Sequence, residues 1–370
     1  MAGETTTPTR EGADRGIVRR LRDSLEGPQT LGNSRWFWGA FLVLLGVLFA
    51  RPFFTTSFII SNEAQLLLSA FLGLSLSLVW GYTGIFSFGQ VAFYGIAGYT
   101  YGVVAINFPT PLPIIAGAGI AILLAALSAL ALGYFMFYGD IRDVFVAIIT
   151  LVATLVLNTF MGQTAGSEWT IGTAALGGAN GMTPIPSLAI GVGDSAVRLT
   201  DASFYWTVLI LLVLVYLGMR WLVNSDYGYT MVAIRENTDR AEMLGYNTKF
   251  MKLLVFTLGG ALAGLSGVLY AAWGNFISPS VFGIAFAAQP IIWVATGGRK
   301  WLAGAIIGTY FLTTIDQQLS LYGGQWAIVI QGSILLFIIM LLPEGFVPRL
   351  YEWIPELIGR VRNRGGESEA

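Results

Sequence analysis

The chain has 370 residues, of which 55% are hydrophobic and 11% charged, whereas soluble domains carry about 25% charged residues. It contains no cysteine and no histidine, which excludes disulfides, thiolate nucleophiles, imidazole bases and the usual zinc and haem ligands. The formal net charge of −1 gives no indication of a nucleic-acid partner. We therefore expect an integral membrane protein without a metal site.

Long uncharged runs predict ten membrane-spanning helices, because a helix needs about 20 apolar residues to cross a bilayer. No charged residue occurs in the 76 positions 64–139, which have room for three crossings, or in the 46 positions 253–298, which have room for two. Single crossings are predicted at 36–50, 144–163, 203–223, 301–315 and 325–342. The predicted fold class is all-α, a polytopic membrane bundle. Its segments 36–50 and 301–315 are short for full spans, so we expect them to be tilted, broken or extended.

The distribution of basic residues predicts which side of the membrane each end of the bundle faces. With residues 1–35 in the cytoplasm and ten crossings, 18 of the 20 Lys and Arg residues fall on the cytoplasmic side, and only Arg51 and Arg198 fall outside. This distribution agrees with the positive-inside rule. We therefore predict a multi-pass protein of the cell (plasma or inner) membrane with both termini in the cytoplasm.

The predicted transmembrane domain, 36–342, is flanked by two cytoplasmic tails, 1–35 and 343–370. In the N-terminal tail, apolar residues between 17 and 25 share one helical face opposite several arginines, which indicates either an interfacial helix or a solvated tail. The segment 164–202 is rich in Gly, Thr, Ser and Pro and is predicted to be an external loop. We prefer to interpret this loop as a packed cap over the bundle, with contact to an external partner as the alternative.

The predicted cytoplasmic loop 224–252 carries four acidic and four basic residues and contains signals for a short helix. Asn237 or Thr238 can cap the helix, Asp239 lies in its first turn, and Gly245 can end it in the left-handed conformation. Glu236 and Arg240 could pair at a spacing of i,i+4 only if the helix began before that cap. The sequence thus predicts a compact helix between two spans.

Three stretches resemble one family of transport proteins. They are "AIRENTDRAEMLGYNTKFMKLLVFTLGGALAGLSGVLYA" at 233–271, with an Ala-x-x-x-Gly core at 241–245, "GYTGIFSFGQVAFYGIAGYT" at 81–100 and "IIWVATGGRKWLAGAIIG" at 291–308. In this order they are similar to the membrane permease subunits of ABC importers of the branched-chain amino acid family, including its urea and short-chain amide branch. The resemblance covers most of the chain from about 66 to 345.

The resemblance implies a transport subunit rather than an enzyme. It implies a second homologous permease, two ATP-binding subunits on the cytoplasmic face and an extracytoplasmic substrate-binding protein as partners, within a lipid bilayer. This chain has no G-x-x-x-x-G-K-[ST] phosphate loop, so ATP and Mg would be bound by the partners and no cofactor is expected here. The residues implied to couple to the ATPase are Arg235, Glu236, Asp239, Arg240, Ala241, Glu242 and Gly245.

The stretch 81–102 combines glycines with a line of polar residues inside an apolar run. If it is largely helical, Thr83, Ser87, Gln90 and Tyr94 share one face, and we predict that this face lines the translocation pathway. Gly81, Gly84 and Gly89 would permit a broken or re-entrant start of the helix. Glycines predicted to permit close helix packing occur in Gly-x-x-x-Gly pairs at Gly98, Gly102, Gly260, Gly264, Gly304 and Gly308.

The sequence leaves alternatives open for the cargo and for the class of transporter. Branched-chain amino acids are the first candidate cargo, and the stretch 277–299 has some likeness to the urea-type branch. A stand-alone secondary transporter or channel is the alternative of another class, although few carboxylates lie within the predicted spans. For Glu63 and Asp316, near predicted external boundaries, we prefer ordinary interfacial solvation to a proton relay.

Overall fold

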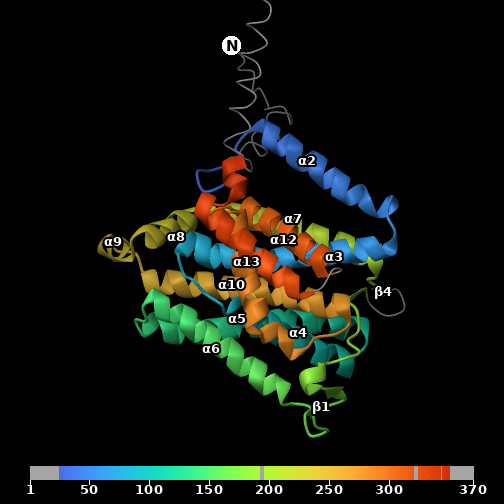
Figure 1. Cartoon of the computed structure of the whole chain (residues 1–370). Coiled ribbons are helices and arrows are strands. Elements are labelled where there is room, and N and C mark those ends of the chain that lie inside the picture. The colour runs from blue at the N-terminus through green and yellow to red at the C-terminus, as the bar shows by residue number, and fades with distance from the viewer. Residues whose placement is uncertain (1–24, 192–195, 321–323, 343, 351–370) are drawn as a thin grey trace, which may run out of the picture.

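The computed structural model describes residues 25–191, 196–320, 324–342 and 344–350 (Figure 1). Within these residues a helix lies at each of the ten predicted span positions, so the predicted all-α bundle is confirmed. The ten helices are α2 (Arg35–Ala50), α3 (Ser57–Leu76), α4 (Gln90–Asn107), α5 (Pro111–Tyr138), α6 (Asp143–Gly162), α7 (Asp201–Val223), α10 (Thr248–Gly274), α11 (Ile284–Gly297), α12 (Leu302–Ser320) and α13 (Gly324–Leu341). The predicted N-terminal interfacial helix falls on residues 1–24 and lies outside the described part.

Six helical segments of the described chain are long and apolar enough to cross a membrane, and they include α2, α3, α5, α6, α7 and α10. Two of these are extended by irregular turns: α2 runs into the 3-10 turn Arg51–Phe53, and α3 runs into the π-helical turn Ser77–Tyr82. The segment predicted at 301–315 is extended as well, because α12 continues to Ser320. The length of α11, 14 residues, makes it a short apolar helix rather than a full span on this criterion.

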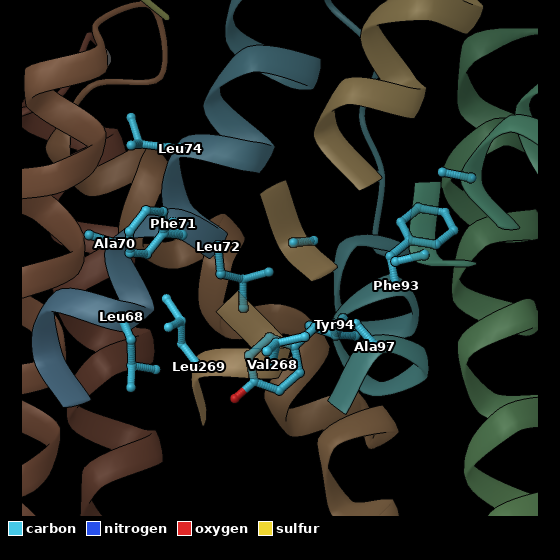
Figure 2. Packing of buried hydrophobic residues seen from close by; sticks show 14 of the residues in the cluster. Leu68, Ala70, Phe71, Leu72, Leu74, Phe93, Tyr94, Ala97, Val268 and Leu269 are labelled. Atoms are coloured by element: carbon cyan, nitrogen blue, oxygen red, sulfur yellow. The ribbon is translucent and has the colours of Figure 1, made fainter. Parts of the chain in front are cut away.

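The centre of the bundle is formed by α3 and α10, most of whose residues are buried. The α10 helix packs against α3, α4 and α5, while α3 also packs against α7 and α12 (Figure 1). Figure 2 shows the side chains of Phe71 and Leu72 from α3 beside Val268 of α10 and Tyr94 of α4. Outer helices instead expose large apolar side chains, which on α5 and α6 include Leu123, Leu127, Phe135, Val144, Val152 and Val156. Because lipid solvates apolar side chains, this outer surface fits a membrane.

The predicted packing glycines all lie at close contacts, although Gly102 meets Met182 and Ile185 of the segment between α6 and α7 rather than another helix. A Cβ atom added to any of the six would lie under 3.0 Å from a neighbouring atom. For Gly260 and Gly264 the neighbours are Ala129 and Ala125 on α5, and for Gly308 they are backbone atoms of α11. Small residues at such contacts let helix backbones approach closely and gain van der Waals contact.

One end of the bundle is covered by the segment between α6 and α7. It contains two short antiparallel pairs, β1 (Thr170–Ile171) with β2 (Ala174–Ala175) and β3 (Ala189–Ile190) with β4 (Val197–Arg198), and the 3-10 turn Gly178–Asn180. The Tyr101 hydroxyl donates to Pro186 O at 2.8 Å, and Asn275 Nδ2 donates to Ile185 O at 2.8 Å. These bonds join the segment to α4 and to the end of α10, so the loop forms the packed cap that the sequence favoured.

At the opposite end, a buried arginine holds the chain that precedes α2. The Arg220 guanidinium, at the end of α7, donates to the carbonyl oxygens of Leu25, Leu31 and Gly32 at 2.7, 3.1 and 2.8 Å. Its flat face lies about 5 Å from the rings of Phe37 and Trp38. This side chain is fully buried, which no sequence pattern predicted.

Replacement of Gly308 by alanine tests the contact between α11 and α12. The added methyl group meets the backbone of α11, which cannot move away as a flexible side chain would, so we expect a loss of about 1–3 kcal/mol in the free energy of unfolding. Gly218→Ala on α7 is the matched control, because no atom lies within 4 Å of its added Cβ. Both variants gain the same helix propensity. Thermal unfolding of the detergent-solubilised protein should show a lower Tm only for Gly308→Ala, and equal Tm values would contradict the packing role.

Candidate coupling segment and membrane pocket

Two short helices occupy the loop between α7 and α10. They are α8 (Asp226–Glu236) and α9 (Thr238–Met243), which projects from one edge of the molecule (Figure 1). Asn237 lies between them in an extended conformation, and its Oδ1 accepts a hydrogen bond from Arg240 N at 2.8 Å. The predicted α9 and its Asn237 cap are therefore confirmed, whereas α8 is an additional helix that the sequence analysis missed.

The end of α9 is closed by a second set of backbone bonds. Gly245 has a φ of +88°, the left-handed conformation that glycine adopts without a steric penalty. Tyr246 N donates to Ala241 O at 3.1 Å and Gly245 N to Glu242 O at 2.9 Å, the pair of bonds that defines a Schellman motif. Both ends of this short helix are thus fixed by local hydrogen bonds.

The tip of α9 exposes two large apolar side chains that the sequence analysis did not select. Met243 is 86% exposed and Leu244 is 76% exposed, whereas Ala241 on the other side of the helix is buried. Asp239 and Arg240 lie exposed beside this tip. An apolar pair placed directly before a helix-ending glycine, inside a charged loop, was the signal that could have identified it.

Side chains of α8 and α9, together called the candidate coupling segment, contact the spanning helices at two points. The Glu242 carboxylate accepts a hydrogen bond from the Thr248 hydroxyl at the start of α10. Arg235 Nη1 donates to Gly81 O in the π-helical end of α3 at 2.6 Å. The short helix is therefore bonded to α10, and α8 to α3.

The possible i,i+4 pair of Glu236 with Arg240 does not form, because the extended Asn237 separates α8 from α9. Glu236 instead pairs with its neighbour Arg235 at 2.8 Å. The hydrogen bond from Arg235, and then its charge, hold the pKa of the Glu236 carboxyl below its ordinary value. Glu236 therefore remains ionised at neutral pH.

The stretch 81–102 is not one continuous helix. Positions 84–89 are non-helical and α4 begins only at Gln90, so the expectation of a helical polar face is wrong, while the expected broken start is present. Thr83 Oγ1 donates to Val79 O of its own helix at 2.5 Å, and Ser87 Oγ accepts from Gly89 N at 3.0 Å. Both hydroxyl groups satisfy the local backbone and are buried.

Gln90 belongs to a buried polar contact among three helices. Ser75 Oγ of α3 lies 2.8 Å from Gln90 Oε1 and 2.7 Å from Gly259 O of α10, while Gln90 Nε2 has no partner. Rotation of the Gln90 amide by 180° lets Nε2 donate to Ser75 Oγ, whose hydroxyl then donates to Gly259 O. In that arrangement Gln90 Nε2, Ser75 Oγ and Gly259 O each have a partner and Oε1 takes the unpartnered position, so Gln90 joins helices.

Tyr94 lines a pocket to which Thr83, Ser87 and Gln90 do not contribute. The pocket, of about 80 Å³, lies between α3, α4, α10, α11 and α12. Its polar lining residues are Gln65, Ser69, Gln289, Thr313, Asp316 and Gln317, and its apolar ones are Leu66, Leu72, Tyr94, Tyr270, Phe286 and Trp293. Gln317 Nε2 donates to Gln65 Oε1 at 3.0 Å across the pocket wall. Within the described residues, no three acidic side chains come together where they could hold a metal ion.

A family model described as "Branched-chain amino acid transport system / permease component" matches residues 59–342. The chain belongs to this permease family. It is therefore a multi-pass membrane transport subunit rather than a catalytic enzyme. The helices from α4 to α13, including the segment α8–α9, lie within the matched range of the permease.

Individual relatives of the permease come from two transport systems. The high-affinity branched-chain amino acid transport system permease protein LivM of Escherichia coli is 27% identical over 338 residues, covering 83% of this chain and 74% of the relative. The autoinducer 2 import system permease protein LsrC of Yersinia pseudotuberculosis is 26% identical over 339 residues, covering 88% and 86%. LsrC of Salmonella paratyphi B is 29% identical over 243 residues, covering 62% and 65%. No solved structure matches the chain.

Removal of the Asn237 side chain tests whether it holds the start of α9. Asn237→Ala deletes the acceptor of the Arg240 amide, at a typical cost of about 1 kcal/mol for a helix cap, equivalent to roughly fivefold faster amide exchange. Hydrogen exchange of the peptide 238–244 in the solubilised permease measures this. Asn237→Asp keeps the acceptor and should keep the protection. Unchanged exchange in the alanine variant would contradict the capping role.

Proposed function

We propose that this permease is one subunit of an ATP-driven ABC importer for branched-chain amino acids, and that α9 couples it to separate ATP-binding subunits. The observation that carries the proposal is the exposed tip formed by Met243 and Leu244 on a helix fixed at both ends. Exposed apolar pairs on a rigid helix suit insertion into a groove of a partner protein. The charged residues around the tip, Asp239 and Arg240, suit the rim of such an interface.

The bonds of the coupling segment provide a route from the ATPase to the spans. A shift of α9 would pull on Thr248 through Glu242, and a shift of α8 would pull on Gly81 through Arg235. These two contacts act on α10 and α3, the central helices. Closure of the ATP-binding subunits would thereby rearrange the bundle and alternate its access between the two sides of the membrane.

The remaining parts of the assembly follow from the family rather than from contacts within this chain. We propose a second homologous permease, two subunits that bind ATP and Mg, and an extracytoplasmic binding protein that delivers the cargo. Both termini and the α8–α9 segment would face the cytoplasm, in keeping with the basic residues at that end. Of the two cargo classes that the sequence leaves open, the family description and the LivM relative support the amino acid over urea.

Reconstitution of the complete importer in vesicles tests the proposed activity. With binding protein, ATP and leucine present, we expect uptake of leucine that stops when ATP is omitted. Uptake of urea under the same conditions should be absent. Leucine transport by this chain alone, without ATP or partners, would instead make it a stand-alone transporter and refute the proposal.

Charge substitution at the tip of α9 tests the coupling contact. The double variant Met243→Asp and Leu244→Asp places two carboxylates where apolar contact is proposed, and both positions are too exposed to disturb folding. Loss of a central apolar contact in an interface costs more than about 2 kcal/mol, so we expect ATP-dependent uptake to fall at least about tenfold. Ile190→Asp, an exposed apolar position in β3 at the other end, is the control. Unchanged uptake with normal membrane insertion would show that α9 is not the coupling site.

A further inference from the structure

The pocket that contains Tyr94 lies in the half of the bundle nearer the cap. Gln65 lies eight residues after the start of α3 at the capped end, about 12 Å along the helix at 1.5 Å per residue. Asp316 lies 14 residues after the start of α12 at the coupling end, about 21 Å along that helix. Both positions therefore lie inside the ends of their helices, on the side away from α9.

The lining of this pocket divides into an aromatic wall and a polar wall. Tyr94 stands at the centre of the aromatic wall, with its ring centroid 5.6 Å from that of Tyr270 and 5.3 Å from that of Phe286. The polar wall is formed by amide and hydroxyl side chains and by one carboxylate, Asp316. No lysine or arginine lines the pocket.

The Asp316 carboxylate lacks a partner within the described chain, in contrast to the carboxylate of Glu63 on α3. Glu63 forms an ion pair with Arg51, whereas no hydrogen bond or ion pair reaches the carboxylate of Asp316 within the described chain. An ionised group at membrane depth is costly without a partner and commonly marks a ligand site. A carboxylate beside aromatic ring faces attracts a cation, because the carboxylate carries a negative charge and the ring faces have a negative electrostatic potential.

We propose that this pocket receives the cationic ammonium group of a zwitterionic amino acid as it passes through the permease, with Asp316 as the group that meets it. The inference rests on the proposed import function and adds the chemistry by which the membrane subunit itself recognises its cargo. The aromatic wall of Tyr94, Tyr270 and Phe286 contacts the ammonium and the adjacent aliphatic carbons. A volume of about 80 Å³ suits the head group of the cargo rather than the whole molecule.

Substitutions at Asp316 in the reconstituted importer test this assignment. Asp316→Asn keeps the shape and removes the charge, and loss of one charge-assisted hydrogen bond should lower leucine uptake about ten- to a hundredfold. Stimulation of ATP hydrolysis by the loaded binding protein should stay within about twofold of wild type, since the coupling segment is distant. Asp316→Glu should restore most of the uptake. Thr314→Val is the control on the same helix. The Thr314 hydroxyl donates to Tyr310 O of α12, and Thr314 does not line the pocket.

A second measurement keeps the assignment testable if the asparagine variant does not assemble. The Tm of the wild-type complex without binding protein is measured with two analogues of leucine. One, 3-methylbutylammonium, keeps the ammonium group and lacks the carboxylate, and the other, 4-methylpentanoate, keeps the carboxylate and lacks the ammonium group. We expect the ammonium probe alone to raise the Tm.

The possible results separate the two proposals. The ammonium site would be overturned by leucine uptake within twofold of wild type in Asp316→Asn, or by loss of uptake and ATP hydrolysis together in an assembled Asp316→Asn importer. A Tm shift by the carboxylate probe alone, or by neither probe, would overturn it as well. Absence of any ATP-dependent leucine uptake in the wild-type importer would instead refute the proposed function.

Discussion

The close approach of α10 to α4 and α5 is the constraint on which the rest of the structure depends. Besides Gly260 and Gly264, Gly267 contributes, because a Cβ atom there would collide with the carbonyl of Tyr94. With its 27 residues α10 is about 40 Å long, the thickness of a bilayer with its head groups. One central helix therefore bonds to α9 at Thr248 and to the cap at Asn275, so the two ends of the molecule share a single rigid element.

Polar contacts join the other central helices to α10. Ser75 joins α3, α4 and α10 at one point, and Ser266 donates to Leu68 O at 2.7 Å further along α3 and α10. Beyond Ser75, α3 loosens into its π-helical turn, a conformation often found at functional sites. Arg235 bonds to that turn and not to the regular helix. Arg235 of α8 thus contacts the least regular part of α3. The regular part of α3 is bonded to α4 and α10 through Ser75 and Ser266.

Sequence patterns predicted those parts of the fold that depend on local chemistry. Uncharged runs located all ten helices because lipid excludes charge along a whole span, and the pair Asn237 and Gly245 located α9 because both act on neighbouring backbone groups. The burial of Arg220 could not be found in this way, since its carbonyl partners lie nearly two hundred positions earlier. The broken start of α4 was expected from Gly81, Gly84 and Gly89, because glycine permits backbone conformations outside a helix. The pocket draws its residues from five helices, so no window of sequence contains it.

Glu63 and Asp316 show how one tertiary contact separates residues that look alike in sequence. The turn Arg51–Phe53, with Pro52 at its start, places Arg51 beside the beginning of α3. There the Arg51 guanidinium forms an ion pair with the Glu63 carboxylate. Asp316 faces the aromatic wall without a resident cation within the described chain. A permanent partner such as an arginine would compete with any cargo for this carboxylate, whereas a pathway requires binding that is strong enough to admit the cargo and weak enough to release it. The absence of a competing cation from the pocket lining meets that requirement, because the carboxylate is then available to each passing molecule in turn.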